Sequence, residues 1–236
     1  MCHVALFLLV WFRQQCLERS LYVKTRESKM PRITAEHEAE KRQRILAAAR
    51  RVFVAKGFHE ASIDDLVAES GVSVGGIYNY YGGKDELIHE SILAAVNAEA
   101  DAVLADTRSA GSVRDKMERA IRGWFDYTID APGAAAFLVQ CWAVASQKPL
   151  IRDLLVRRRE RMAMLGVLIG REGVATGELP GDFDVDAMAR GFSALLDGLV
   201  LQRVEEGDSY RRPEMERRAL AFLDLVAPRR PSRTPE

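Results

Sequence analysis

Residues 62–84 read SIDDLVAESGVSVGGIYNYYGGK, and this stretch decides the fold. Ser62 is a favourable N-cap residue. It precedes apolar residues at the i, i+3, i+4 spacing of one helix face, namely Ile63, Leu66 and Val67. Gly71 can adopt the positive φ that ends this helix, and Ser73 can cap a second helix after a short break. Helices joined by so short a turn must cross at a steep angle. The stretch therefore predicts a helix-turn-helix, in which the second helix enters the major groove of DNA.

The second helix of this motif has unusual outward residues. Three residues are expected to face inward: Val72, Ile77 and Tyr81. The outward set is then Ser73, Val74, Gly75, Gly76, Tyr78, Asn79 and Tyr80. Each glycine weakens a helix by roughly 1 kcal/mol relative to alanine, and close approach to a phosphate or base edge would explain that cost. Tyrosine can donate to phosphates, and asparagine can pair with an adenine edge. The alternative is a helical subdomain whose tyrosines only cover a core.

Residues that flank the two helices complete the predicted DNA surface. Lys84, with Asp85 and Glu86 behind it, begins another helix, whose N–H groups and lysine favour a phosphate. The full set of predicted DNA-binding residues is Ser62, Ser73, Val74, Gly75, Gly76, Tyr78, Asn79, Tyr80 and Lys84.

The sequence around this motif resembles the N-terminal domain of TetR-type transcriptional repressors. The resemblance rests on GVSVGGIYNYY followed by KDEL, preceded by RILAAARRVFVAKGF and SIDDLVA, and it covers roughly residues 41–92. It implies an all-helical, two-domain homodimer whose larger domain binds a small molecule that releases the protein from DNA. It also implies that Tyr78 and Lys84 contact phosphates and that Gly76 and Asn79 occupy base-reading positions.

Two residues depart from the family pattern. Gly76 stands where threonine or serine is usual, and Tyr81 stands where phenylalanine is usual at the end of the reading helix. Because glycine removes a base-reading side chain, the operator sequence of relatives does not carry over to this chain.

The composition is that of an ordinary globular protein. The chain has 236 residues, and its 34 Lys and Arg balance 34 Asp and Glu, so net charge indicates no particular partner. Its three cysteines, Cys2, Cys16 and Cys141, are widely spaced and favour neither a disulfide framework nor a zinc site. The four histidines are scattered, and no motif of a serine hydrolase, a zinc protease or a phosphate loop occurs. We expect no enzyme activity, no metal and no cofactor.

The chain divides into four predicted segments. Residues 1–30 form an extension that is either translated leader sequence or disordered. Residues 31–84 form the helix-turn-helix domain, residues 85–228 a ligand-binding and dimerisation domain, and residues 229–236 a disordered tail. The apolar run in the extension is too short for a bilayer, which needs about 20 residues, and it lacks the flanks of a secretory signal. We therefore expect a cytoplasmic protein without membrane attachment, with Met30 as its true start.

The whole chain predicts an all-α fold of about nine helices. Helical periodicity recurs at residues 36–56, 85–106, 113–129, 134–146, 149–171 and 184–204, and Pro213 opens a final helix. Arg157, Arg158 and Arg159 follow one another on one of these helices. Because successive helical residues point in different directions, this run predicts a solvated face rather than a nucleic-acid site.

Aromatic residues are the candidates for lining an effector pocket in the larger domain. They are Trp124, Tyr127, Phe137 and Trp142. Packing in a filled core is the alternative for each of them. No carboxylate or histidine cluster indicates a metal or a strong cation, so the sequence favours an apolar or weakly polar organic effector.

A stripe of small residues near the C-terminus predicts the dimer interface. It comprises Ala187, Gly191, Ala194 and Gly198, flanked by Leu195. Glycine weakens a helix, and close approach of another helix would compensate. Two such helices paired with their symmetry mates would form a four-helix interface and present the reading helices to palindromic, double-stranded operator DNA. Intramolecular packing is the alternative.

The predicted function is a ligand-responsive DNA-binding transcriptional regulator. Repression, with release from the operator by a small organic molecule, follows from the resemblance. The alternative is a ligand-independent or partner-regulated DNA-binding dimer, because periodicity alone does not establish a pocket.

Overall fold

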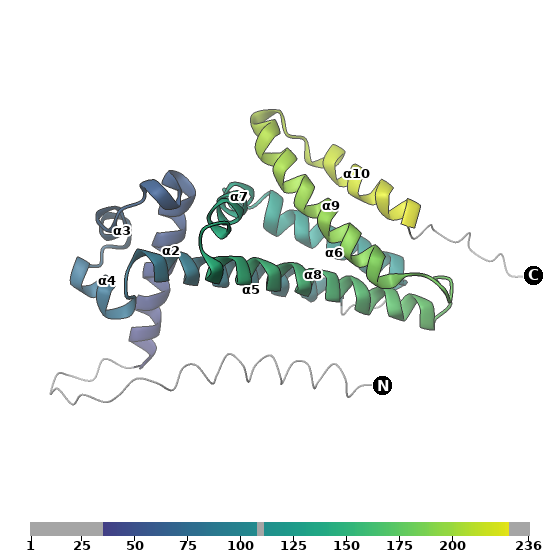
Figure 1. The fold of residues 1–236 in the computed structure, drawn as a ribbon, viewed down its shortest axis with the longest axis horizontal. Helices are drawn as coiled ribbons and strands as arrows, with labels where there is room; N and C mark the ends of the chain where they lie inside the picture. The colour runs from purple at the N-terminus through teal and green to yellow at the C-terminus, as the bar shows by residue number, and fades with distance from the viewer. Residues whose placement is uncertain (1–34, 108–110, 227–236) are drawn as a thin grey trace, which may run out of the picture. The chain divides into compact units, whose positions relative to one another are not determined.

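The computed structural model describes residues 35–107 and 111–226. Within these ranges the chain forms nine α-helices, α2 to α10, with one turn each of π-helix and 3₁₀-helix and no β-strand (Figure 1). The predicted all-α fold of about nine helices is confirmed. The extension of residues 1–30, with its proposed start at Met30, and the tail of residues 229–236 lie outside the described residues.

The described residues from Ala39 onward form one compact unit. This unit includes parts of both predicted helical domains, so the boundary near residue 84 stays a prediction. No single described helix has the length and hydropathy of a membrane span; the bent pair Val113–Ile129 and Ala134–Ala145 meets those two criteria only together.

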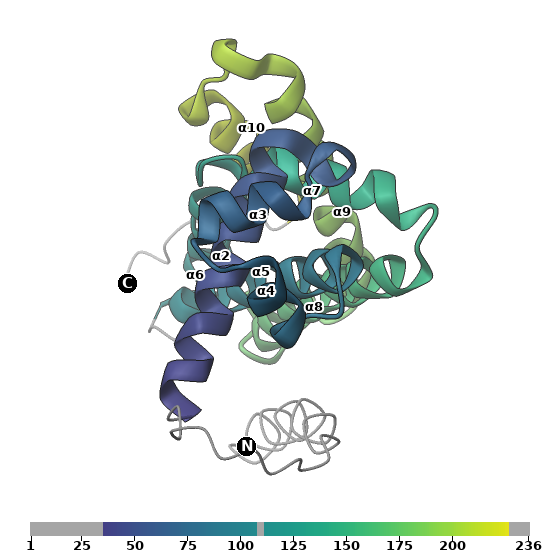
Figure 2. The same ribbon diagram turned by 90° about the vertical axis from the view of Figure 1, so that its left-hand side faces the viewer.

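The first three described helices lie side by side (Figures 1 and 2). Helix α2 (Ala35–Glu60) bends at Gly57, where φ is 83°. Helix α3 (Ile63–Ser70) is followed by helix α4 (Val74–Tyr80) after a three-residue turn centred on Val72. The inward residues of the three helices share one buried cluster: Ile45, Ala49, Val52, Phe53, Phe58, Leu66, Val72, Ile77 and Tyr81.

Side-chain caps explain why α3 and α4 begin and end where they do. At the start of α3, the Asp65 amide donates to Ser62 Oγ at 3.1 Å, and the Ser62 amide donates to Asp65 Oδ2 at 3.0 Å. This reciprocal pair is a capping box. Gly71 ends α3 with a φ of 64°. At the start of α4, the Gly76 amide donates to Ser73 Oγ at 3.2 Å. The predicted helix-turn-helix is thus confirmed at its helix ends.

The remaining helices pack into a bundle. They are α5 (Lys84–Thr107), α6 (Val113–Trp124), a π-turn (Phe125–Ile129), α7 (Ala134–Ala145), α8 (Pro149–Ala175), α9 (Val185–Glu206), a 3₁₀-turn (Gly207–Ser209) and α10 (Arg212–Val226). Helix α8 packs against both α5 and α9, α6 covers α5, and α10 lies against α9 and α6 (Figure 1). Buried apolar residues run through this bundle and continue into the cluster of α2 to α4.

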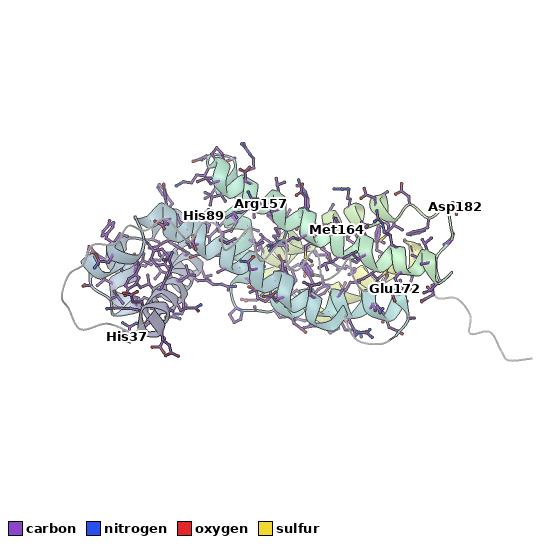
Figure 3. All side chains as sticks on the ribbon, turned by 90° about the horizontal axis from the view of Figure 1, so that it is seen from below. His37, His89, Arg157, Met164, Glu172 and Asp182 are labelled. Carbon is purple, nitrogen blue, oxygen red and sulfur yellow. The ribbon has the colours of Figure 1, made fainter. Side chains whose placement is uncertain are left out.

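One residue of the arginine run differs from its prediction. Arg157 is exposed on α8 (Figure 3), as predicted, but Arg158 is buried and forms two short bonds to Glu99 of α5 and one to Asp197 of α9. Although burial alone would lower the pKa of Arg158, the charges and hydrogen bonds of Glu99 and Asp197 raise it. The expected solvated face therefore holds for Arg157 and Arg159 and is wrong for Arg158.

The amino-terminal end of α7 packs directly on α2. The Phe58 amide donates to Gln140 Oε1 at 3.2 Å, and the Phe58 ring meets Phe137 edge-on with centroids 5.3 Å apart. Gly133 precedes α7 with a φ of 72°, and a Cβ placed there would lie 2.1 Å from Val54 Cγ1. This junction attaches the helix-turn-helix to the larger bundle.

Candidate DNA-binding interface and ligand cavity

The exposed side of α4 is formed mostly by the residues predicted to face outward. Tyr78 is 50% exposed and Val74 is 43% exposed. Ser73, Gly75 and Asn79 are also exposed, while Val72, Ile77 and Tyr81 are buried as predicted. Gly76 and Tyr80 are the exceptions, because both are half-buried, and Tyr80 packs against the core. Tyr80 is three positions after buried Ile77, so the helical repeat brings it back toward the same side.

The two glycines of α4 have different surroundings. Within the described residues, no atom lies within 4 Å of a Cβ placed on Gly75, so that face of the helix is open. A Cβ on Gly76 would lie only 2.6 Å from Val72 Cγ1. Packing inside the protein therefore accounts for Gly76, the departure from the family pattern. Only Gly75 retains the interpretation that glycine allows another molecule to approach closely.

The second departure, Tyr81, also has an internal explanation. Its hydroxyl donates to the Arg42 carbonyl of α2 at 3.1 Å, and the Arg42 guanidinium lies over its ring, 4.8 Å from the centroid. Burial raises the pKa of Tyr81. Phenylalanine could not donate this bond, so the tyrosine adds a link between α2 and the end of α4.

The flanking residues predicted to contact phosphates make internal contacts in this structure. Lys84 Nζ donates to the His59 carbonyl at 2.8 Å, which fixes the start of α5 against the end of α2. The Gly82 amide donates to Glu86 Oε2 at 2.6 Å, so a carboxylate already faces the amino-terminal end of α5. Ser62 is engaged in its capping box. The cap at Ser62 was predicted, whereas sequence reasoning missed the partner of Lys84, because that contact depends on the fold.

The capping carboxylate of α3 is strongly acidic. A hydrogen bond from Lys56, followed by those from Ser62, lowers the pKa of Asp65 to about 2. The Lys56 Nζ to Asp65 Oδ1 distance is 2.6 Å. The capping box is therefore charged at neutral pH, which suits its place at a helix amino terminus.

The four aromatic pocket candidates do not line a single cavity. Trp124 lines a cavity of about 70 Å³ between α5, α6, α8, α9 and α10. Tyr127 and Phe137 line a second one of about 30 Å³, closer to α2. Trp142 belongs to neither lining, and it packs half-buried against the core.

The stripe predicted to form the dimer interface lies on the open side of α9. Ala187, Gly191 and Ala194 are exposed, and Leu195 and Gly198 are half-buried. Among the described residues, no atom comes within 4 Å of a Cβ placed on Gly191 or Gly198. The same face continues to Leu201, which is 46% exposed. The two glycines are therefore not required by packing within the described part of one chain.

In the described ranges, no group of three or more histidine, cysteine, aspartate or glutamate side chains could hold a metal ion.

Two family models match this chain. Residues 45–91 match bacterial regulatory proteins of the tetR family, and residues 113–228 match the C-terminal part of BetI-type transcriptional repressors. Together the two matches cover more than half of the sequence. The first includes the whole helix-turn-helix, and the second includes the cavity-bearing bundle from α6 onward.

Individual relatives agree with these matches. The HTH-type transcriptional regulator SrpR of Pseudomonas putida is 28% identical over 76% of this chain and 82% of its own length. BetI 2 of Chromohalobacter salexigens is 29% identical over 79% of this chain and 88% of its own length. A regulator from Saccharomonospora viridis, solved in complex with choline, has a TM-score of 0.71 and 25% identity, covering 79% of this chain and 96% of its own.

The capped helix-turn-helix, the two family matches and the regulators that resemble the chain over most of its length agree with one another. The chain belongs to the TetR family of DNA-binding, helix-turn-helix transcriptional regulators.

Proposed function

We propose that this protein is a repressor that binds a palindromic operator as a homodimer and leaves it when a small organic effector occupies the larger bundle. The observation that carries the DNA-binding part is the surface of α4, where Gly75, Tyr78 and Asn79 are exposed on a helix fixed at both ends. Membership of the family supports the repressor role, and the complex of a structural neighbour with choline supports an effector.

Three exposed residues of α4 have a chemical role in the proposal. The Tyr78 hydroxyl can donate to a phosphate oxygen, and Asn79 can form paired hydrogen bonds with a base edge. Gly75 adds no side chain and so lets the backbone approach the duplex. Lys84 Nζ donates to the His59 carbonyl at 2.8 Å in this structure. To contact a phosphate, Lys84 must give up that hydrogen bond when DNA binds.

The change Gly75→Ala tests this surface without damaging the fold. Alanine meets no described atom and should strengthen α4 by up to about 1 kcal/mol. On DNA, however, an extra methyl group in a tight contact costs about 1–3 kcal/mol, or roughly 5- to 150-fold in affinity. We expect an unchanged or higher unfolding temperature together with weaker binding to duplexes that the wild-type protein has selected from a random pool.

Gly181→Ala is the matched control for that experiment. Gly181 is an exposed glycine in the connection between α8 and α9, and its Cβ would also meet no described atom within 4 Å. Its affinity for the same duplexes should equal that of the wild type. Full DNA binding by Gly75→Ala would show that α4 does not approach DNA at this residue.

The stripe on α9 supports the homodimer part of the proposal. Gly191→Gln should leave the protomer folded, because a Cβ at this exposed position would meet no described atom within 4 Å and the change removes a helix-weakening glycine. It would hold two α9 helices apart, and a symmetric interface contains the change twice. Sedimentation equilibrium should show a dimer dissociation constant at least about tenfold higher than in the wild type. Gly181→Gln should associate as the wild type does. If Gly191→Gln kept the wild-type dimer dissociation constant, the dimer interface would not include Gly191.

A further inference from the structure

The larger cavity has an almost uniformly apolar lining. Its lining residues come from five helices, and the indole N–H of Trp124 on α6 and the hydroxyl of Ser193 on α9 are the polar side-chain groups among them. No ionisable side chain belongs to this lining among the described residues. A molecule that fits here must therefore be mainly apolar, with polar atoms placed to meet an indole N–H or a hydroxyl.

Trp124 supplies a donor that the protein leaves unused. The residue is 1% exposed, and its Nε1 has no hydrogen-bond acceptor in the described part of the chain. Buried tryptophan N–H groups are normally paired, because an unpaired buried donor destabilises the protein. An acceptor on a bound molecule would remove that penalty. Ser193 is also buried and lines the same cavity, where its hydroxyl can donate or accept.

The lining does not suit a permanent cation. A charge moved from water into an apolar cavity needs a counter-charge or several oriented dipoles, and aromatic faces alone compensate only part of its lost hydration. Two buried carboxylates of the bundle are already engaged. Glu99 accepts hydrogen bonds from Arg158 and Thr128, and Glu118 pairs with Arg114 and Arg122.

The size of the cavity indicates a compact molecule or a group that enters with some adjustment. At about 70 Å³ it is smaller than the cavity of about 150 Å³ that holds benzene in an engineered lysozyme. Three of its lining residues are methionines: Met117, Met162 and Met188. Methionine side chains are flexible and polarizable, so this lining can adapt to a flat aromatic ring.

We propose that the effector is a small, neutral, largely apolar molecule with one hydrogen-bond acceptor, such as an aryl ketone or ester, and that Trp124 Nε1 donates to that acceptor. This inference rests on the proposed function, because it names the effector class for the same regulator. It differs from the choline bound by the structural neighbour.

Two probes of equal shape test the hydrogen bond. Acetophenone has a carbonyl where α-methylstyrene has a methylene, so the pair differs in the acceptor. Their dissociation constants are measured by calorimetry with the full-length wild type and with Trp124→Phe, which keeps an aromatic ring and lacks the N–H. The preference of each protein is the ratio of its two dissociation constants. Because the hydration of the free probes is the same for both proteins, it cancels when the two preferences are compared. We expect Trp124→Phe to lower the preference for acetophenone at least about fivefold.

Trp142→Phe is the matched control, because Trp142 is half-buried and does not line the cavity. It should keep the wild-type preference. An unchanged preference in Trp124→Phe, binding of neither probe by the wild type at millimolar concentration, or tighter binding of choline than of acetophenone would each overturn the inference. If acetophenone binds with the expected preference but does not release DNA, the site stands and the proposed effector function fails.

Discussion

Replacing Glu99 by alanine is expected to lower the free energy of unfolding by about 3–5 kcal/mol. Both Glu99 and Arg158 have side chains that are 5% exposed, and the guanidinium donates to the carboxylate from Nε at 2.6 Å and from Nη2 at 2.7 Å. Removing the acid leaves a buried guanidinium with Asp197 as its remaining ion-pair partner among the described residues. It also removes the acceptor of the Thr128 hydroxyl.

Urea denaturation at one fixed protein concentration measures this loss. Glu160→Ala is a suitable control, because Glu160 is exposed on α8 two residues from Arg158, and surface changes usually stay within about 0.5 kcal/mol. Asp197→Ala should cost less, about 1.5 kcal/mol, because the Asp197 side chain is 26% exposed and water can replace it. The double change Glu99→Leu with Arg158→Met should recover most of the stability, since both charges of this buried pair are then replaced by apolar side chains. Equal losses for Glu99→Ala and Glu160→Ala would refute this account.

The ion pairs of Glu99, Arg158 and Asp197 lie along the helix that joins the two proposed functional regions, α5. The helix begins at Lys84, beside the end of α4, and contains Glu99 farther along. One helical turn later, Val103 lines the cavity that contains Trp124. One continuous helix therefore connects the proposed effector cavity with the proposed DNA surface. Arg158 fixes its middle to α8 and, through Asp197, to α9.

Local signals made the helix-turn-helix predictable from sequence. The caps at Ser62 and Ser73 and the glycine at Gly71 act within a few residues, and the structure has each of them in the expected role. The inward residues of α4 also follow from the helical repeat. Family resemblance added what the residues alone could not, namely the class of transcriptional regulator to which this motif belongs.

Long-range contacts explain what the sequence could not show. Arg158 looked solvated within an arginine run, because its partner Glu99 lies 59 residues earlier on another helix. Gly76 looked like a site of DNA approach, although a side chain there would meet Val72. The aromatic candidates line different cavities or none, because the lining of each cavity comes from helices far apart in the sequence.

Adding a single methyl group at Gly133 should also lower the free energy of unfolding strongly. Gly133→Ala must keep a φ of 72°, which costs an L-residue about 1–2 kcal/mol. Its new Cβ would also lie 2.1 Å from Val54 Cγ1, and such overpacking adds about 1–3 kcal/mol. We expect the free energy of unfolding to fall by about 2–5 kcal/mol, measured by urea denaturation monitored by circular dichroism.

A second glycine separates the two contributions. Gly177 has a φ of 74°, and a Cβ there would meet no described atom within 4 Å. Gly177→Ala should therefore show the backbone cost alone, about 1–2 kcal/mol. Combining Gly133→Ala with Val54→Ala should remove the clash. After the cost of Val54→Ala alone is subtracted, the remaining loss in the free energy of unfolding should be close to that of Gly177→Ala. If the double variant recovered none of the stability lost in Gly133→Ala, the contact with Val54 would not explain the need for glycine at this junction.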